Sequence, residues 1–334
     1  MTDDDLRSLR ATGNTAAVAE ALTVRANARL TSGLWPGARA DLEEAAALHT
    51  SLGNAVDVAR CTHLAATMAR LSKDIPGAKA LARRAVTLSA QGTPWRVAAY
   101  TELGEIGRVE DDCDAAEQAY ANALEDGVRA GMIPSAQATL IRRRAQALVA
   151  GGRAQEGAGI LSGARRLLED AGEAHEAVRT GVEEATAWHH ANDRPRAVAL
   201  REATTRAAAA IGDEHALGDL ELLAVTDALE GEAPDMALQA ALRARTHALA
   251  GNAPLVYMSA ALAIARISES LGDRDAAYEA LAVGWVTLGD RMGPDVGRST
   301  FEPKLQELAT RWGRDAFIAV RDSYTARRRA PRSE

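Results

Sequence analysis

The chain has 334 residues and a formal net charge of −7 at pH 7, and its residues include 36 Arg, 3 Lys and 75 Ala. An apolar fraction of 47% with 25% charged residues is ordinary for a folded protein and excludes extensive disorder. Alanine is the best helix former and a poor strand residue, so this composition excludes a protein built mainly from β-sheet. The acidic balance argues against a generally basic nucleic-acid-binding protein.

The compartment follows from what the sequence does not contain. The first residues lack the basic start and apolar core of a secretory signal, and no apolar stretch approaches the roughly 18 residues of a membrane span. The two cysteines, Cys61 and Cys113, form no Cys-x-x-Cys motif, which argues against a disulfide or a zinc site. We therefore expect a cytoplasmic protein without metal, cofactor or membrane partner.

Residues that end helices alternate along the chain with residues that begin them. Gly follows one set of amphipathic stretches, as at Gly53 and Gly212, and Gly just past a helix end adopts the left-handed conformation without strain. Pro precedes the other set, as at Pro36 and Pro76, because its missing N–H would be unpaired at a helix start anyway. The alternation predicts consecutive pairs of antiparallel helices.

Small residues recur at a period of about 40 residues and define the register of these pairs. In the second helix of each pair they are Ala38, Ala78, Ala116, Gly157, Ala197, Ala237 and Ala277. Twelve residues earlier, in the first helix, stand Ala26, Ala66, Gly104, Ala145, Ala185, Val225 and Ala265. Slim side chains at both positions let the paired helices cross closely, so the period predicts a solenoid. Ala66, Ala116, Ala145, Ala197 and Ala277 are expected to be almost fully buried between paired helices.

Seven repeats are predicted over residues 14–289. They span residues 14–52, 54–91, 94–131, 133–172, 173–212, 214–251 and 254–289, without a linker between them. Residues 1–13 are expected to form an N-terminal lead-in, and the Gly- and Pro-rich residues 290–298 a loop. Residues 299–328 are expected to form a degenerate capping repeat, with helices at about 300–311 and 314–328, that covers the open end of the stack. Residues 329–334 are expected to be a mobile basic tail.

The third repeat carries the clearest motif. It reads Tyr100-x-x-Leu103-Gly104, then Cys113-Asp114-Ala115-Ala116, then Tyr120 and Ala123-Leu124. This pattern resembles the tetratricopeptide repeat (TPR) family, although Gly107 replaces a usual aromatic residue and the period exceeds the family's 34 residues. The longer period is similar to the extended repeats of bacterial regulatory proteins.

The resemblance implies an all-α fold. In that fold about seven antiparallel helix pairs form an α-solenoid that winds as a right-handed superhelix, with a capping helix pair at the C-terminal end. HEAT-type repeats share the period and remain the structural alternative.

In TPR proteins the first helix of each pair lines a concave groove, and the resemblance implies the same here. Counting from the slim residue of each first helix gives the candidate groove residues Arg60, His63, Thr67, Arg70, Thr101, Glu105, Arg108, Arg142, Gln146, Arg179, Thr186 and His189. The charged groove positions of repeats two to five hold five arginines and one glutamate. These positions therefore predict a basic groove on an acidic protein.

Three functions remain open. The first is a non-catalytic scaffold that binds an acidic or phosphorylated segment of another protein, because arginine forks bind carboxylates and phosphates with two parallel hydrogen bonds. The second is a regulator that responds to a ligand or peptide. The third is an enzyme that uses the acidic cluster at residues 110–114 to hold a metal ion, although this cluster coincides with a predicted turn and helix N-cap. We expect a protein or peptide partner and no catalytic residues.

Overall fold

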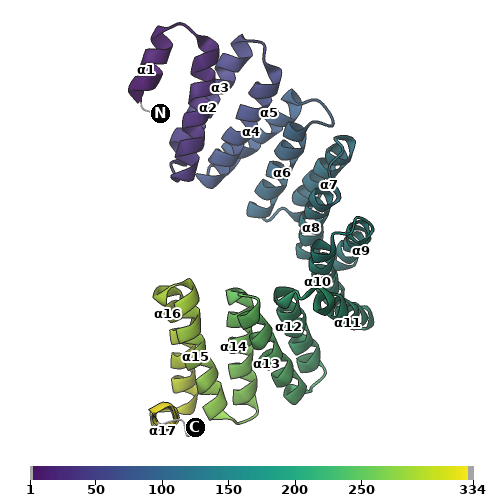
Figure 1. Cartoon of the computed structure of the whole chain (residues 1–334), viewed down its shortest axis with the longest axis vertical. Helices are drawn as coiled ribbons and strands as arrows, with labels where there is room; N and C mark the ends of the chain where they lie inside the picture. The colour runs from purple at the N-terminus through teal and green to yellow at the C-terminus, as the bar shows by residue number, and fades with distance from the viewer. Residues whose placement is uncertain (1–2, 330–334) are drawn as a thin grey trace. The chain divides into compact units, whose positions relative to one another are not determined.

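The computed structural model describes residues 3–329, and within this range the backbone forms seventeen α-helices and no strand (Figure 1). The helices are α1 (Asp3–Ala11), α2 (Thr15–Thr31), α3 (Trp35–Ser51), α4 (Ala55–Leu71), α5 (Ile75–Leu88), α6 (Pro94–Val109), α7 (Cys113–Arg129), α8 (Pro134–Ala150), α9 (Ala154–Asp170), α10 (Ala174–His190), α11 (Arg194–Ile211), α12 (Glu214–Glu230), α13 (Pro234–Ala250), α14 (Pro254–Ser270), α15 (Arg274–Met292), α16 (Pro294–Trp312) and α17 (Arg314–Arg329). The all-helical prediction is confirmed. Within residues 3–329, no helix combines the length and the apolar character needed to cross a lipid bilayer.

Each of the seven predicted repeats contains two helices, from α2 and α3 in the first to α14 and α15 in the seventh. The capping residues and glycines act as expected where these helices begin and end. At the start of α4, for example, the Asn54 side chain accepts a hydrogen bond from the backbone N–H of Asp57. Gly53, just before it, has a left-handed backbone with φ of 69°. Short turns of this kind bring helices that are adjacent in the sequence side by side.

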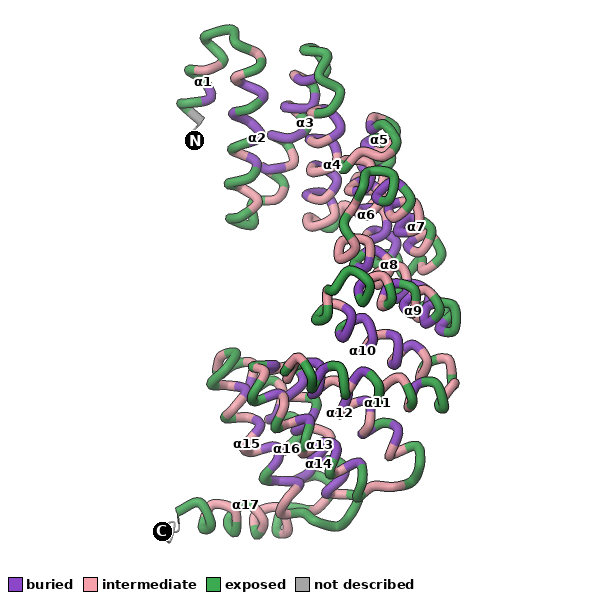
Figure 2. Tube along the Cα trace, turned by 45° about the vertical axis from the view of Figure 1, so that its right-hand side comes forward, coloured by how far each residue is buried: buried purple, intermediate pink, exposed green. Residues whose placement is uncertain are grey.

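The small residues that define the register are all buried, including the five alanines whose burial was predicted. Ala66, Ala116, Ala145, Ala197 and Ala277 are each at most 1% exposed. Buried residues recur on every helix from α2 to α16, whereas α17 carries none (Figure 2). The predicted helix crossings therefore coincide with the core.

The chain divides into two compact units, an N-terminal unit (Met1–Ala191) and a C-terminal unit (Asn192–Glu334). The boundary falls between α10 and α11, inside the fifth predicted repeat. The seven predicted repeats over residues 14–289 are thus distributed over two units, and this division was not predicted. At this boundary Asn192 has a left-handed backbone and Asp193 caps α11, as Lys73 and Asp74 do before α5, so the sequence carries no signal for the division.

The N-terminal lead-in forms a helix, α1, which was not predicted. Leu6 and Leu9 lie one helical turn apart and join the apolar cluster that α2 and α3 share, and Leu6 is only 2% exposed. Two apolar residues are too few for a periodicity signal, so burial against α2 explains this helix better than local propensity does.

The structure does not contain the loop that was expected at residues 290–298. Only Gly293, with φ of 106°, separates α15 from α16. The glycines of this stretch permit close packing instead of breaking helices. A Cβ atom at Gly297 would lie 2.6 Å from the carbonyl oxygen of Trp285 and 2.9 Å from the backbone nitrogen of Gly289.

The capping repeat consists of α16 and α17 and begins five residues earlier than expected, because α16 starts at Pro294. Phe301 of α16 is fully buried. Phe317 of α17 packs edge-on against Tyr278, with the ring centroids 5.6 Å apart. Of the expected tail, Arg329 ends α17, and residues 330–334 lie outside the described residues.

Buried carboxylates paired with arginines of neighbouring helices are a second feature of the core. The pairs are Asp41 with Arg25, Glu102 with Arg70, Asp126 with Arg96, Glu184 with Arg165 and Asp227 with Arg201. Each of these carboxylate residues is at most 6% exposed. Since removal of one partner would leave a buried charge uncompensated, these arginines are structural residues.

Candidate functional site

A pocket of about 630 Å³ opens on α6, α8 and α10, each of which is the first helix of a predicted repeat in the N-terminal unit. We call it the charged pocket, and its lining residues are Glu105, Arg108, Ser135, Ala136, Thr139, Arg142, Arg143, Gln146, Glu176 and Arg179. Four arginines and two glutamates give this lining a net formal charge of +2. Five of the twelve candidate groove residues meet in this pocket, namely Glu105, Arg108, Arg142, Gln146 and Arg179.

Two of the four arginines are held firmly by the protein's own carboxylates. Arg142 is the most buried, with 11% of its side chain exposed, and it pairs with Glu183 and, at 3.4 Å, with Glu176. Arg143 donates to Oε1 of Glu105 at 2.7 Å. These contacts join α8 to α10 and α6 and keep the two guanidinium groups in place.

The other two arginines have long, local ion pairs. Arg108 contacts Glu105 at 3.2 Å and Arg179 contacts Glu176 at 3.5 Å, each within one turn of its own helix. Their side chains are 48% and 63% exposed. Exposed pairs of this kind contribute about 0–1 kcal/mol, so a ligand anion can replace the glutamates at little cost.

Tyr120 of α7 holds Glu105 in position. The Tyr120 hydroxyl donates to Oε1 of Glu105 at 2.8 Å. Burial, followed by this hydrogen bond, raises the pKa of the Tyr120 phenol well above its ordinary value, so the hydroxyl keeps its proton. Gly104 makes room for the ring, because a Cβ atom there would lie 2.4 Å from Cε1 of Tyr120. The TPR-like motif of the third repeat thus supports a pocket residue.

A second pocket, of about 380 Å³, adjoins the first. We call it the apolar pocket, and its lining residues are Ala145, Gln146, Val149, Ala150, Leu161, Glu183, Thr186, Ala187 and His190. Gln146 lines both pockets. Gln146 and Thr186 were candidate groove residues, whereas the other seven lining residues were not predicted. Both volumes fall in the range of about 300–1,000 Å³ that is typical of ligand-binding pockets.

The candidate residues on α4 and early α6 do not reach either pocket. Arg70 and Thr67 both donate to the buried Glu102, at 2.5 Å and 3.0 Å. Arg60 pairs with an aspartate one turn earlier on its own helix, at 2.8 Å. Thr101 donates to a backbone carbonyl of α6 at 2.9 Å. Arg70 in particular belongs to the core ion pairs.

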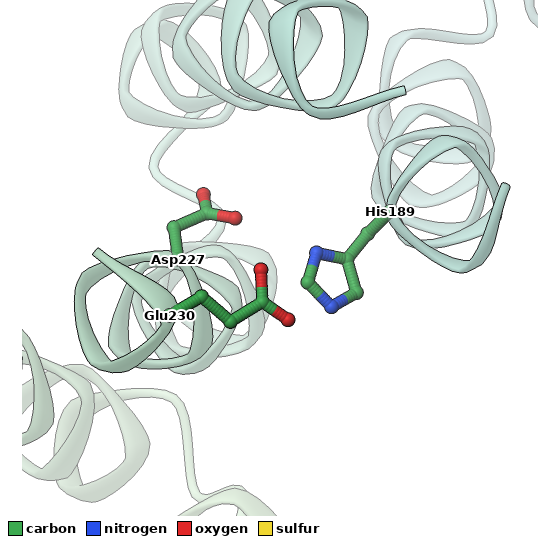
Figure 3. Close-up of side chains that lie close together, drawn as sticks. All are labelled: His189, Asp227 and Glu230. Atoms are coloured by element: carbon green, nitrogen blue, oxygen red, sulfur yellow. The ribbon is translucent and has the colours of Figure 1, made fainter. Parts of the chain in front are cut away.

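His189 lies on α10 and is not among the residues that line either pocket. Its ring meets the ring of His190 edge-on, with centroids 6.0 Å apart. Figure 3 shows His189 and also Asp227 and Glu230, which project from α12 of the C-terminal unit. Within that unit, Arg201 donates to Asp227 at 3.1 Å.

The acidic cluster at residues 110–114 forms a turn and a helix cap. Glu110 accepts a hydrogen bond from Lys79 at 2.5 Å. Asp112 caps α7 by accepting from the backbone N–H of Ala115 at 3.0 Å. These contacts fit the structural interpretation of the cluster, in which acidic groups favour the positive end of a helix.

Sequence reasoning missed the carboxylates that hold the arginines. The partners are separated by 32 residues for Arg70 and Glu102, 38 for Arg143 and Glu105, and 41 for Arg142 and Glu183. These separations are near one repeat length, so a search for arginine and acid one repeat apart on first helices would have found them. A search restricted to neighbours on one helix could not.

The stability of the N-terminal unit is expected to fall as the pH drops from about 7 to 5 because of His63. Burial lowers the pKa of this histidine, against a smaller opposing effect of Glu102. Its Nδ1 atom is buried without a hydrogen-bond partner among the described residues. The unfolded chain takes up a proton near the ordinary histidine pKa of about 6.5, and the folded chain only at lower pH, so acid favours unfolding.

Urea unfolding of the wild type and of His63→Gln at both pH values tests this expectation. The variant should lose less stability on acidification than the wild type. Equal losses would show that other groups account for the pH dependence.

Stacked pairs of antiparallel helices with small residues at their crossings define, in each unit, an α-solenoid of the TPR type. No protein-family model matches the chain, and no curated protein sequence matches it either. Solved structures, in contrast, share its fold.

A signal-transduction ATPase with a tetratricopeptide repeat sensor, from Pyrococcus horikoshii, aligns with a TM-score of 0.59 at 13% identity, over 85% of this chain and 44% of that chain. A Rap protein complexed with Competence and Sporulation Factor gives a TM-score of 0.55 at 11% identity, over 94% and 88%. The apo quorum sensor NprR from B. thuringiensis gives 0.55 at 10% identity, over 87% and 84%. These likenesses show the fold, and they confirm the TPR-like prediction.

Proposed function

We propose that the protein is a non-catalytic regulatory binding module whose N-terminal unit holds an extended segment of a partner protein or a signalling peptide. The observation that carries this proposal is the charged pocket. Three successive first helices contribute four arginines to it, against two glutamates, on a chain whose net charge is −7. The proposed ligand is acidic, because a carboxylate or phosphate complements this local excess of positive charge.

The contacts inside the charged pocket support two different roles for its four arginines. Arg142 and Arg143 are held in position by glutamates, and Arg108 and Arg179 can turn toward a ligand because their own pairs are long and exposed. A guanidinium fork offers two parallel hydrogen bonds to a carboxylate or phosphate. In a pocket that partly excludes water, such a contact is stronger than in bulk solvent.

The structural neighbours favour regulation over passive scaffolding. Their names include a sensor, a quorum sensor and a complex with a sporulation factor. A solenoid suits this role because each repeat contacts only its neighbours, so a ligand that bridges three repeats can alter their relative packing. The enzyme alternative is less well supported, since Glu110 and Asp112 of the acidic cluster already have structural partners.

Reversing two pocket charges, with Arg108→Glu and Arg179→Glu combined, is expected to abolish capture of the partner or to weaken its affinity at least about tenfold, which corresponds to about 1.4 kcal/mol. The variant turns an excess of two positive charges into an excess of acid. Affinity capture from a lysate of the producing cells, followed by quantitative mass spectrometry and interferometry with the purified partner, measures the effect.

A matched control carries Arg196→Glu and Arg243→Glu in the C-terminal unit. Those side chains are 61% and 55% exposed and also pair with a carboxylate. The control changes the net charge by the same amount and should capture the same partners as the wild type. If the pocket variant binds as the wild type does, with the same dependence on salt, the proposed function is wrong.

A further inference from the structure

We propose that the apolar pocket receives an apolar side chain of the same segment whose acidic group enters the charged pocket. The ligand class is then a peptide with Asp or Glu within about three residues of a Leu, Ile, Met or Phe. This inference rests on the proposed function and deepens it. The site would then recognise an acidic residue and a nearby apolar residue together, instead of binding any anion.

The continuity of the two pockets along α8 sets the spacing. Arg142, Gln146 and Val149 are three or four residues apart, so they lie on one face of that helix. Arg142 lines the charged pocket, Val149 lines the apolar pocket and Gln146 lines both. At 1.5 Å per residue the step from Arg142 to Val149 is about 10 Å, which an extended peptide covers in about three residues.

The lining of the apolar pocket fits a medium-sized apolar side chain. Ala145 of α8 and Ala187 of α10 contribute only small side chains, and Leu161 of α9, which is 2% exposed, also lines the pocket. Thr186 uses its hydroxyl to donate to a carbonyl of its own helix at 2.9 Å, which leaves its methyl group for the pocket. Carbon therefore dominates the exposed lining.

Two polar groups are placed to hold the peptide backbone between the pockets. The carboxylate of Glu183 binds Arg142 through Oε1, while its Oε2 is buried with no hydrogen-bond partner among the described residues. A buried carboxylate oxygen without a donor is costly, and a turn of the Glu183 side chain would bring Oε2 to the pocket, where a peptide N–H can donate to it. The Gln146 side chain is exposed at the shared edge and offers both a donor and an acceptor.

Selection from random linear peptides displayed on phage, with the full-length protein immobilised, tests the proposal. The wild type should enrich peptides in which an acidic residue stands within three residues of a large apolar residue. The Thr186→Phe variant, which fills the apolar pocket, should lose the apolar preference and keep the acidic one. Thr246→Phe is the matched control, because Thr246 of α13 is exposed, makes the same hydrogen bond to its own helix and lines neither pocket; this variant should select as the wild type does.

A synthetic copy of an enriched peptide then serves to measure how much each substitution changes the binding affinity. Its affinity should fall about tenfold or more in Thr186→Phe and stay within about twofold in Thr246→Phe, with circular dichroism confirming that both variants are folded. Enrichment of acidic peptides without an apolar preference would overturn this inference and leave the proposed function standing. Failure to enrich any acidic peptide would overturn both.

Discussion

Replacing Asp126 by alanine is expected to lower the free energy of unfolding by about 3–5 kcal/mol. Asp126 is 3% exposed. Its carboxylate accepts hydrogen bonds from the backbone N–H of Gly92 at 2.8 Å and from Nε of Arg96 at 2.9 Å. The substitution leaves the partly buried guanidinium of Arg96 and the backbone N–H of Gly92 without their carboxylate. Urea unfolding followed by circular dichroism measures the loss.

The neighbouring residue supplies the control. Glu125 forms an exposed pair with Arg129 and has 62% of its side chain accessible, so Glu125→Ala should cost no more than about 1 kcal/mol. Hydrogen exchange should locate the damage of Asp126→Ala in α5, α6 and α7, because repeats couple mainly to their neighbours. A cost equal to that of the Glu125 variant would mean that the buried pair contributes nothing beyond a surface pair.

Replacing Gly297 by alanine is expected to destabilise the C-terminal unit by about 1–3 kcal/mol. The new methyl group would meet the backbone of α15 at Trp285 and Gly289, as close as 2.6 Å. Backbone atoms cannot rotate away as a side chain can, so α15 and α16 must move apart. Thermal unfolding should show a lower transition temperature, and the fluorescence of Trp285 and Trp312 should change.

A second glycine, which lies in a helix with open space around it, should show the opposite change in stability when it is replaced by alanine. Gly163 of α9 has no atom within 4 Å of the position of a Cβ. Gly163→Ala should therefore stabilise the protein by about 0.5–1 kcal/mol, because alanine loses less backbone entropy in a helix. If both variants shift stability in the same direction, the close crossing of α15 and α16 is not what requires Gly297.

The same physics explains where the sequence misled. Gly289 and Gly297 resemble a loop in composition, and a composition rule cannot tell a glycine that breaks a helix from one that lets two helices touch. The distinction depends on the distance between α15 and α16. Leu6, likewise, becomes part of a helix only because α2 covers it.

The candidate site was predictable in part. The spacing of groove positions located Glu105, Arg108, Arg142, Gln146 and Arg179, which line one pocket. It also assigned Arg70 to the groove on equal terms, although this arginine holds a buried glutamate. Whether an arginine serves the ligand or the core depends on carboxylates that lie about one repeat away in the sequence.

The helix content, the pairing of helices and the positions of the small crossing residues are all predictable from the sequence. Those properties depend on local propensity, on capping and on close crossings that repeat at a fixed interval, all of which the order of residues records directly. Three further features become visible only in three dimensions: the division after Ala191, the partners of the arginines and the apolar pocket. Each of these depends on side chains far apart in the sequence that share one small space, and their burial and distance have no counterpart in a linear pattern.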